Sequence, residues 1–554
     1  MAFTTLPGTS GAATTLVGTS GIDSVSIGAD LTANVFVGAQ QAADVVNLTG
    51  AATRSQFSIK GGQGADTFSF AGSTLDKSFI NGNANVDTFG SDTDRAQLTT
   101  STIRGGQGID SIFVSNASGS FVNGNKQADT INLSGVAAAS EIHGGADNDN
   151  LTIGNLAQLT DTLVHGDKGN DTITVTLQAG QEGISNNSTV QGGEGNDTLN
   201  GSTATASLLM AGGTSSDSLD GGSNTDTING GDGADSIDGN AGADQLSGGD
   251  GNDEFIYQNA TDLFSGAGPV QTVDLIDGQG GIDEIVINNE GRAFTITAAN
   301  TWDPSSRGLE RITAFGGATG NVSVTIDDDA AGIGITRIDL SADTTAAGND
   351  TISGATVTNA FNLTLIGSAG SNNAIGGAGT DTIDGGLGVD NLSGGLGTDS
   401  ISGGVGTDTI DSGQQADTIT GGDGADDFVM ESTGAAFVGA NADTILNFVQ
   451  GAAGDALRCT AANFAGLTAG QATNFLAAAG GSANAAATIM VGTTAQLGAI
   501  TGGAAKGNTR MAYNVTTGQW LYDANGDWAA GSIVIANCAG LTLAGLNTAN
   551  LVFA

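Results

Sequence analysis

Aspartate and glycine return together at nine-residue intervals in part of this chain. Residues 385–411 read GGLGVDNLS, GGLGTDSIS and GGVGTDTID, with aspartate sixth and an aliphatic residue eighth. A catalytic site would be written once, so a repeat this strict indicates a lattice of packed side chains or of bound ions. Glycine permits the positive-φ backbone that turns carbonyl oxygens toward a cation, and aspartate adds a carboxylate oxygen. Such hard oxygen donors suit Ca²⁺ better than zinc or copper.

Two tracts carry the nonapeptide, with five copies in residues 212–256 and seven in 367–429. If two copies form one coil, turns 18 residues apart stack on the same edge and share an ion. The eighth residue begins a short strand, and its side chain points into a core. The predicted pairs are Asp217 with Asp235, Asp226 with Asp244, Asp235 with Asp253, Asp381 with Asp399, Asp390 with Asp408, Asp399 with Asp417, and Asp408 with Asp426. Asn372 stands where an aspartate is expected, so its turn should bind calcium weakly or not at all.

A longer period organises the N-terminal part. Turns of the form G-x-x-x-x-D recur about every 21 residues between Asp23 and Asp217. Alternating stretches near each turn predict short strands with one buried face, for example Ile103, Ile112 and Val114. We predict further calcium ligands in this part at Asp66, Asp110, Asp171 and Asp197. An equally good interpretation is that these N-terminal turns are merely tight and hold no ion.

These periods predict an all-β protein. The expected fold is a parallel β-solenoid of about 21-residue coils that continues into 18-residue coils and ends in a β-rich C-terminal domain. Residues 259–366, which contain Pro269, Pro304 and Trp302, are expected to be a more irregular β-rich interruption. The predicted domains are 1–210 (N-terminal solenoid), 211–258 (first nonapeptide tract), 259–366 (interruption), 367–432 (second tract) and 433–554 (C-terminal domain).

The charge excludes several kinds of partner. With 14 basic and 58 acidic side chains the formal net charge is −44, so nucleic acid and anionic membrane are poor partners and metal cations are good ones. No apolar run approaches the roughly 18 residues that a membrane-spanning helix needs. The segment 1–15 lacks the basic and apolar regions of a secretory signal peptide. Cys459 and Cys538 are equally compatible with one disulfide and with two buried thiols.

Catalytic chemistry has little support. His143 and His165 are the only histidines, and neither an H-E-x-x-H zinc motif nor a G-x-S-x-G nucleophile motif occurs. The two histidines lie one coil apart, and we interpret them as exposed residues beside turns rather than as metal ligands. A polysaccharide lyase or epimerase on a β-helix stays as an alternative, although it needs a cluster of basic residues and tyrosine, and these residues look scattered.

The nonapeptides resemble the hemolysin-type calcium-binding repeat, or RTX, family. That resemblance implies parallel β-rolls that fold when calcium binds, in a protein exported by a type I secretion apparatus. Residues 442–458 and 518–543 and the final LVFA look like the C-terminal secretion domain of such proteins. At submicromolar cytosolic calcium the chain would stay unfolded and could pass through the secretion apparatus, and near-millimolar external calcium would then fold it.

A long solenoid rich in threonine, alanine and glycine, with no enzyme domain, is similar to surface-layer and oscillin-like fibril members of the family. We therefore expect a non-enzymatic, extracellular protein that binds several Ca²⁺ ions and assembles with itself on the cell surface. A cell-surface polysaccharide is a second candidate partner. The alternatives are a calcium-dependent adhesin or matrix-binding protein and the lyase or epimerase above.

Overall fold

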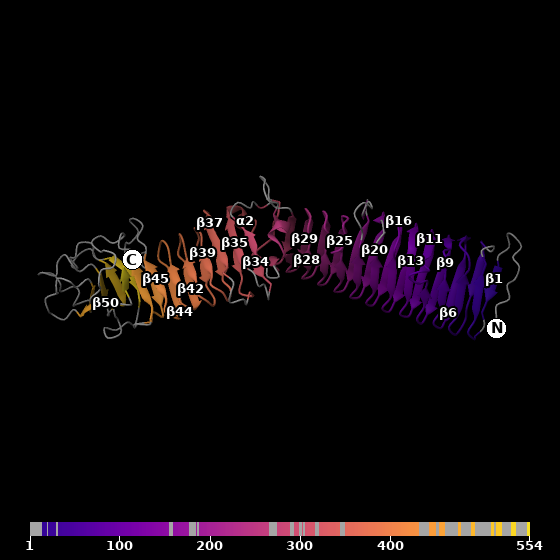
Figure 1. Cartoon of the computed structure of the whole chain (residues 1–554), viewed down its shortest axis with the longest axis horizontal. Helices are drawn as coiled ribbons and strands as arrows, with labels where there is room; N and C mark the ends of the chain where they lie inside the picture. Colours follow the sequence, from indigo (N-terminus) through magenta and orange to yellow (C-terminus); the bar gives the residue numbers. More distant parts are fainter. Residues whose placement is uncertain are drawn as a thin grey trace.

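The structure is a computed structural model of the chain. It describes residues 14–459 except 19, 29–31, 155–158, 177–183, 186–187, 265–273, 289–292, 298–301, 303–304, 316–320, 344–348, 360, 431–442 and 450–453. Beyond 459 it describes 475–477, 489–492, 511–514, 517–522, 533–538 and 551–553. These residues form one elongated rod with the two ends of the chain at opposite ends (Figure 1).

Parallel strands stacked along the rod form its walls. Sheet 1 covers the N-terminal half and has 13 strands among the described residues. They are β1 (Thr14–Val17), β3 (Val35–Gly38), β6 (Ser58–Gln63), β9 (Phe79–Ala84), β12 (Thr102–Gln107), β14 (Phe121–Lys126), β17 (Glu141–Ala146), β20 (Leu163–Lys168), β23 (Thr189–Glu194), β25 (Leu209–Thr214), β27 (Thr227–Asp232), β29 (Gln245–Asp250) and β31 (Leu275–Gly280).

Two further sheets complete the walls. Sheet 3 takes over in the C-terminal half with β33 (Phe294–Ile296), β35 (Val322–Asp327), β37 (Thr351–Thr356), β39 (Asn373–Ile375), β41 (Asn391–Ser393), β43 (Thr409–Asp411), β45 (Asp427–Met430), β47 (Ala456–Cys459) and β53 (Leu551–Phe553). Sheet 2 runs the whole length and includes β2 (Ser24–Ile27), β4 (Val45–Leu48), β13 (Ser111–Ser118), β26 (Ser218–Asp220), β28 (Ser236–Asp238), β30 (Glu254–Tyr257), β40 (Thr382–Asp384), β42 (Ser400–Val405) and β44 (Thr418–Asp423).

Each nonapeptide contributes one strand, so two of them make one coil. In the first tract the strands alternate between sheets 1 and 2, and Thr227 pairs with Gln245, two nonapeptides further along the chain. In the second tract they alternate between sheets 2 and 3, and Thr382 pairs with Ser400 at the same separation. This confirms the predicted parallel solenoid, with longer coils in the N-terminal part and shorter coils in the nonapeptide tracts.

The core is a single column of aliphatic and aromatic side chains. The predicted inward positions of the N-terminal coils are fully buried, as are the eighth residues of the nonapeptides, and examples are Ile103, Ile112, Val114, Leu219, Ile237 and Ile410. Period-two alternation within each strand puts these side chains on the inner face, and coil stacking then packs each one on its copy one coil away.

The strand pairing of sheet 2 continues through residues 259–366. There β30 pairs with β32 (Glu284–Ile287), β32 with β34 (Arg311–Ala314), β34 with β36 (Arg337–Asp339) and β36 with β38 (Thr364–Ile366). The coils lengthen because loops and the short helices α1 (Ala260–Leu263) and α2 (Asp328–Gly332) are inserted between strands. The rod axis bends in this region, where sheet 1 gives way to sheet 3 (Figure 1).

The described C-terminal strands join the end of the solenoid. Residues 551–553 form β53, which extends sheet 3 beside β47. An antiparallel set, β50 (Met511–Asn514), β51 (Gln519–Tyr522) and β52 (Ile533–Asn537), joins sheet 2 through β46 (Asp443–Leu446). Cys538 is a free buried thiol, and burial raises its pKa to about 12. The side chain of Cys459 lies outside the described residues, so the choice between a disulfide and two thiols stays a prediction. No helix in the described parts is long and apolar enough to cross a membrane.

Candidate calcium ladder

The turn aspartates stack into continuous ladders along the edges of the rod. In the longest ladder, the backbone N–H of each aspartate donates to Oδ1 of the aspartate one coil later, from Asp23 to Asp283. The donor–acceptor distance is 2.8 Å from Asp217 to Asp235 and 2.7 Å from Asp226 to Asp244. Every one of the seven predicted stacked pairs is joined by such a bond. The aspartates are therefore inward-facing parts of the fold and are buried.

The second carboxylate oxygen is what distinguishes these aspartates. Among the described residues, a buried Oδ2 without any protein hydrogen-bond donor occurs at all but two of the predicted calcium ligands. These are Asp66, Asp110, Asp171, Asp197, Asp217, Asp235, Asp244, Asp253, Asp390, Asp399, Asp408, Asp417 and Asp426. Burying an ionised oxygen without a partner costs several kcal/mol, so each turn requires a cation or a proton.

Backbone carbonyl oxygens face the same point. The position that a Cβ on Gly230 would occupy lies 2.3 Å from Asp235 Oδ2 and 2.6 Å from the carbonyl oxygen of Gly248, in the next coil. At Gly61 the corresponding distances are 2.1 Å to Asp66 Oδ2 and 2.7 Å to Gly82 O. A carboxylate and a carbonyl oxygen therefore approach the same glycine, and the carboxylate oxygen has no protein donor, a set of hard oxygen donors that suits a calcium ion.

Burial makes these carboxylates hard to ionise in the absence of a cation. Burial, with a smaller contribution from neighbouring aspartates, raises the pKa of Asp87, Asp129, Asp149 and Asp244 to about 8, although the backbone N–H bond opposes the shift. The pKa of Asp66 and Asp253 rises to about 6 for the same main reason. A bound Ca²⁺ would reverse this effect, because its charge favours the carboxylate form.

Asn372 provides an internal comparison. It occupies the place of an aspartate in its ladder, and its backbone N–H donates to Asp390 Oδ1 at 2.7 Å. Its side-chain Nδ2 lies 3.0 Å from both Gly370 O and Gly385 O and 3.2 Å from Ser368 O. At this turn the side-chain amide donates hydrogen bonds to the carbonyl oxygens. In the aspartate turns the same place is taken by a carboxylate oxygen, which has no hydrogen to donate. The carbonyl oxygens of such a turn therefore favour a partner with positive charge. Where the turn carries aspartate instead of asparagine, a cation fits that role.

Two predicted ligands differ from the rest. Oδ2 of Asp226 accepts from Gly222 N at 2.6 Å, and Oδ2 of Asp381 accepts from Gly377 N at 2.7 Å. Both carboxylates also accept an N–H bond at Oδ1, from Leu208 and Leu363 respectively. Because their oxygens already have donors, these two turns have the least need of a cation.

The ladder also contains members that the sequence did not identify as ligands. A bare buried Oδ2 occurs as well at Asp44, Asp87, Asp129, Asp149 and Asp283. Several of these turns have lost glycines, as at Asn83, but asparagine tolerates the left-handed conformation there (φ 79°). Gly82, the first residue of that turn, is retained, and its Cβ position lies 2.0 Å from Asp87 Oδ2. The first glycine and the aspartate are the signal that could have found these turns, except that of Asp44, where Ala39 replaces the glycine.

The interpretation of His143 and His165 as exposed residues beside turns is wrong. They lie on paired strands, β17 and β20, and their side chains are only 17% and 22% exposed. Both contact Asp167, and its hydrogen bond raises the pKa of His143. Lys126 and Lys168 line a cavity together with His165 and Asp167, so some basic residues that look scattered in the sequence lie close in space.

Comparison with known families agrees with the geometry. The family model of the RTX calcium-binding nonapeptide repeat matches residues 182–203, 210–235, 220–255, 366–401 and 402–429. The chain carries RTX calcium-binding repeats. Proteins with these repeats are typically secreted calcium-binding β-roll proteins. The matches include the turns of Asp197 and of all predicted ligands from Asp217 to Asp426, and those of Asp66, Asp110 and Asp171 lie outside them. No curated protein matches the sequence significantly.

Asn372→Asp should add a calcium site to the second RTX tract. The substitution replaces the donating amide by a carboxylate facing Gly370 O and Gly385 O, which repel it unless a cation binds. We expect one additional Ca²⁺ per chain by equilibrium dialysis, and unfolding of this tract at a lower chelator concentration. Asp399→Asn is the reciprocal control, since it should remove at least one ion while keeping the neutral-amide arrangement. Unchanged stoichiometry in both variants would contradict the proposed ion positions.

Proposed function

We propose that this protein is a secreted, calcium-loaded structural rod that assembles with itself into a layer or fibril on the cell surface. The calcium part rests on one observation, the rows of buried carboxylate oxygens that face carbonyl oxygens without a donor. Calcium would neutralise these rows and complete the fold outside the cell, after export by a type I apparatus.

The N-terminal end of the rod supports self-assembly. Among the described residues, β1 and β2 pair only with the following coil, so each presents an open strand edge. Nearby Val17, Ile22 and Phe36 are 59%, 73% and 47% exposed. An open parallel edge beside exposed apolar side chains is a template for another chain, and a second copy is the natural occupant in an array.

Electron microscopy of the purified chain with and without millimolar calcium tests this assembly. We expect regular fibrils or sheets in calcium that disappear with chelator. A matched triple variant, Val17→Thr, Ile22→Thr and Phe36→Thr, should keep the circular dichroism spectrum in calcium while it reduces assembly. Single particles at all calcium concentrations would refute the array and leave calcium binding as a device for folding alone.

Binding of a cell-surface polysaccharide is a second candidate function. A cavity of about 860 Å³ opens on the outer face of sheet 1, and Asn123, Asn125, Lys126, Lys168 and Gln191 are among its lining residues. Amide and ammonium groups on a β-sheet face suit sugar hydroxyls and carboxylates. Saturable binding of an acidic polysaccharide by single particles would favour an adhesin, and turnover of uronate residues would favour the lyase or epimerase.

A further inference from the structure

Two histidines and an aspartate come together on the outer face of sheet 1, away from the buried aspartates of the ladder. His143 of β17 and His165 of β20 are register partners on adjacent parallel strands. Their ring centroids are 5.8 Å apart with an interplanar angle of 33°. Adjacent strands bring partners on one face within contact distance, so the one-coil spacing of the two histidines produces a pair of imidazoles.

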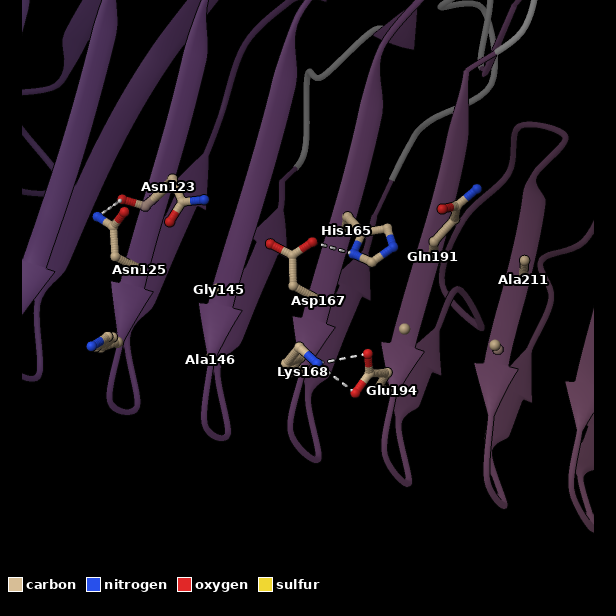
Figure 2. A pocket seen from close by; sticks show the side chains of 14 residues that line it. Asn123, Asn125, Gly145, Ala146, His165, Asp167, Lys168, Gln191, Glu194 and Ala211 are labelled. Atoms are coloured by element: carbon tan, nitrogen blue, oxygen red, sulfur yellow. Dashed lines mark hydrogen bonds and ion pairs between the residues drawn. The ribbon is translucent and has the colours of Figure 1, made fainter.

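Asp167 completes the group from near the end of its strand. Its φ of 78° is unusual for a residue with a side chain, and its register partners are Gly145 and Gly193. With glycine on both sides, no neighbouring side chain in register covers its carboxylate. The carboxylate turns back toward His165 along the strand (Figure 2).

The distances place three metal-type donors around one point. His143 Nδ1 lies 2.9 Å from Asp167 Oδ2, and His165 Nδ1 lies 2.7 Å from Asp167 Oδ1. The buried Nδ1 of His165 makes this close contact with the carboxylate and has no other hydrogen-bond partner among the described residues. The three donor atoms lie within 4.8 Å of one another. Ligand atoms around a tetrahedral zinc ion are about 3.3 Å apart, so small side-chain rotations would suffice.

The surroundings match a metal-binding histidine. Glu141 Oε2 is 3.7 Å from His143 Nε2, the ring nitrogen that faces away from Asp167. Metal-ligating histidines usually present their second N–H to a carboxylate, which orients the ring and strengthens the donor. His165 and Asp167 also line the cavity on this face, with Gln191 and Lys168 beside them, so a bound ion would keep an open side (Figure 2).

We propose that His143, His165 and Asp167 bind one d-block divalent cation of the Zn²⁺ class, at a site separate from the calcium ladder. The donor set separates the two kinds of ion. Imidazole nitrogen favours zinc and its neighbours, whereas calcium prefers the all-oxygen sites of the ladder. The remaining coordination position faces the cavity, where water or an anionic ligand completes the site.

Calorimetric titration of the full chain with Zn²⁺ in millimolar Ca²⁺ tests this site, because calcium keeps the carboxylate sites of the ladder filled. We expect one Zn²⁺ per chain with a dissociation constant in the micromolar range or below. Co²⁺ in its place should give visible absorption bands typical of nitrogen coordination. Absence of zinc binding at about 100 µM would overturn the proposal and leave the three residues as an ion-paired cluster.

Matched variants can be taken from the residues that pair with this cluster on the adjacent strands of sheet 1. His143 pairs with Asn123 and His165 with Gln191, so His143→Asn and His165→Gln introduce side chains that this sheet already carries. Asp167→Gly reproduces the turn residue on either side. Each variant should retain the calcium-loaded circular dichroism spectrum and weaken zinc binding at least about 10- to 100-fold. Zinc affinity and stoichiometry that stay the same in all three would place the ion elsewhere and refute the assignment.

Discussion

Removing calcium at pH 8 should abolish most of the β-structure of this protein. Without the ion, stacked buried carboxylates such as Asp217, Asp235 and Asp399 would meet carbonyl oxygens with no donor between them. Each site filled at 100 times its dissociation constant adds about 2.7 kcal/mol, and the ladders contain many sites. Circular dichroism during chelator titration should show loss of the strand signal, with recovery when calcium is restored.

Magnesium is the matched control, because its small octahedral shell dehydrates reluctantly and fits a carbonyl-lined turn poorly. It should fail to restore the strand signal at equal concentration. Amide hydrogen exchange of the same samples would locate the loss of structure, and loss of protection at Asp44 and Asp66 would show that the N-terminal turns also bind calcium. A strand signal that resists chelation at pH 8 would contradict the cation requirement.

Acid should partly replace calcium in the calcium-free protein. The pKa of Asp87, Asp129, Asp149 and Asp244 rises from 3.8 to about 8 in the fold. A group whose pKa is raised by folding stabilises the fold when protonated, and this stabilisation is lost as the pH increases through 8. Lowering the pH from 8 to 5 should therefore stabilise the calcium-free chain by several kcal/mol in total, at about 1.4 kcal/mol for each tenfold gain in the proton affinity of a carboxylate.

Circular dichroism of chelated samples at pH 8, 6.5 and 5 measures this effect, because the strand signal lost at pH 8 should return as the pH falls. Denaturant unfolding then gives the stability of the samples that have refolded. The calcium-loaded protein should show the opposite trend, because protons compete with Ca²⁺ for the same carboxylates and weaken its binding as the pH falls. A calcium-free protein with equal or lower stability at pH 5 would show that the ladder carboxylates are solvated or paired, in conflict with their burial.

Local repetition is why much of this fold was predictable. Each coil repeats the pattern of the one before it. The burial of Ile103 and Ile112 therefore follows from alternation within a strand, and the coil period follows from the spacing of the aspartates. The stacking of Asp217 on Asp235 follows from the same arithmetic, since two nonapeptides make one coil. Calcium as the cation also follows from residue type, since aspartate and backbone oxygens are the donors offered.

Long-range alignment explains what was missed. Across 259–366, Glu254 pairs with Glu284 and Glu284 with Arg311, and these separations are longer than the nonapeptide coil and unequal to each other. The inserted loops and short helices therefore hide the period. Asp350, Asp443 and Asp455, outside the regular tracts, are also buried in the structure. Each of these aspartates stands at the start of a strand, but Thr345, Val438 and Gln450 occupy the place of the first glycine, so the motif is not visible in the sequence.

The sequence by itself determined the coil length, the buried positions, the row of turn carboxylates and their preference for calcium, because all of these depend on short-range spacing and residue chemistry. Only the tertiary structure decided which oxygens lack a donor, since that depends on atoms one coil away. It also decided that His143, His165 and Asp167 meet on one face. Their contact depends on strand register and on the glycines at 145 and 193 that leave Asp167 uncovered.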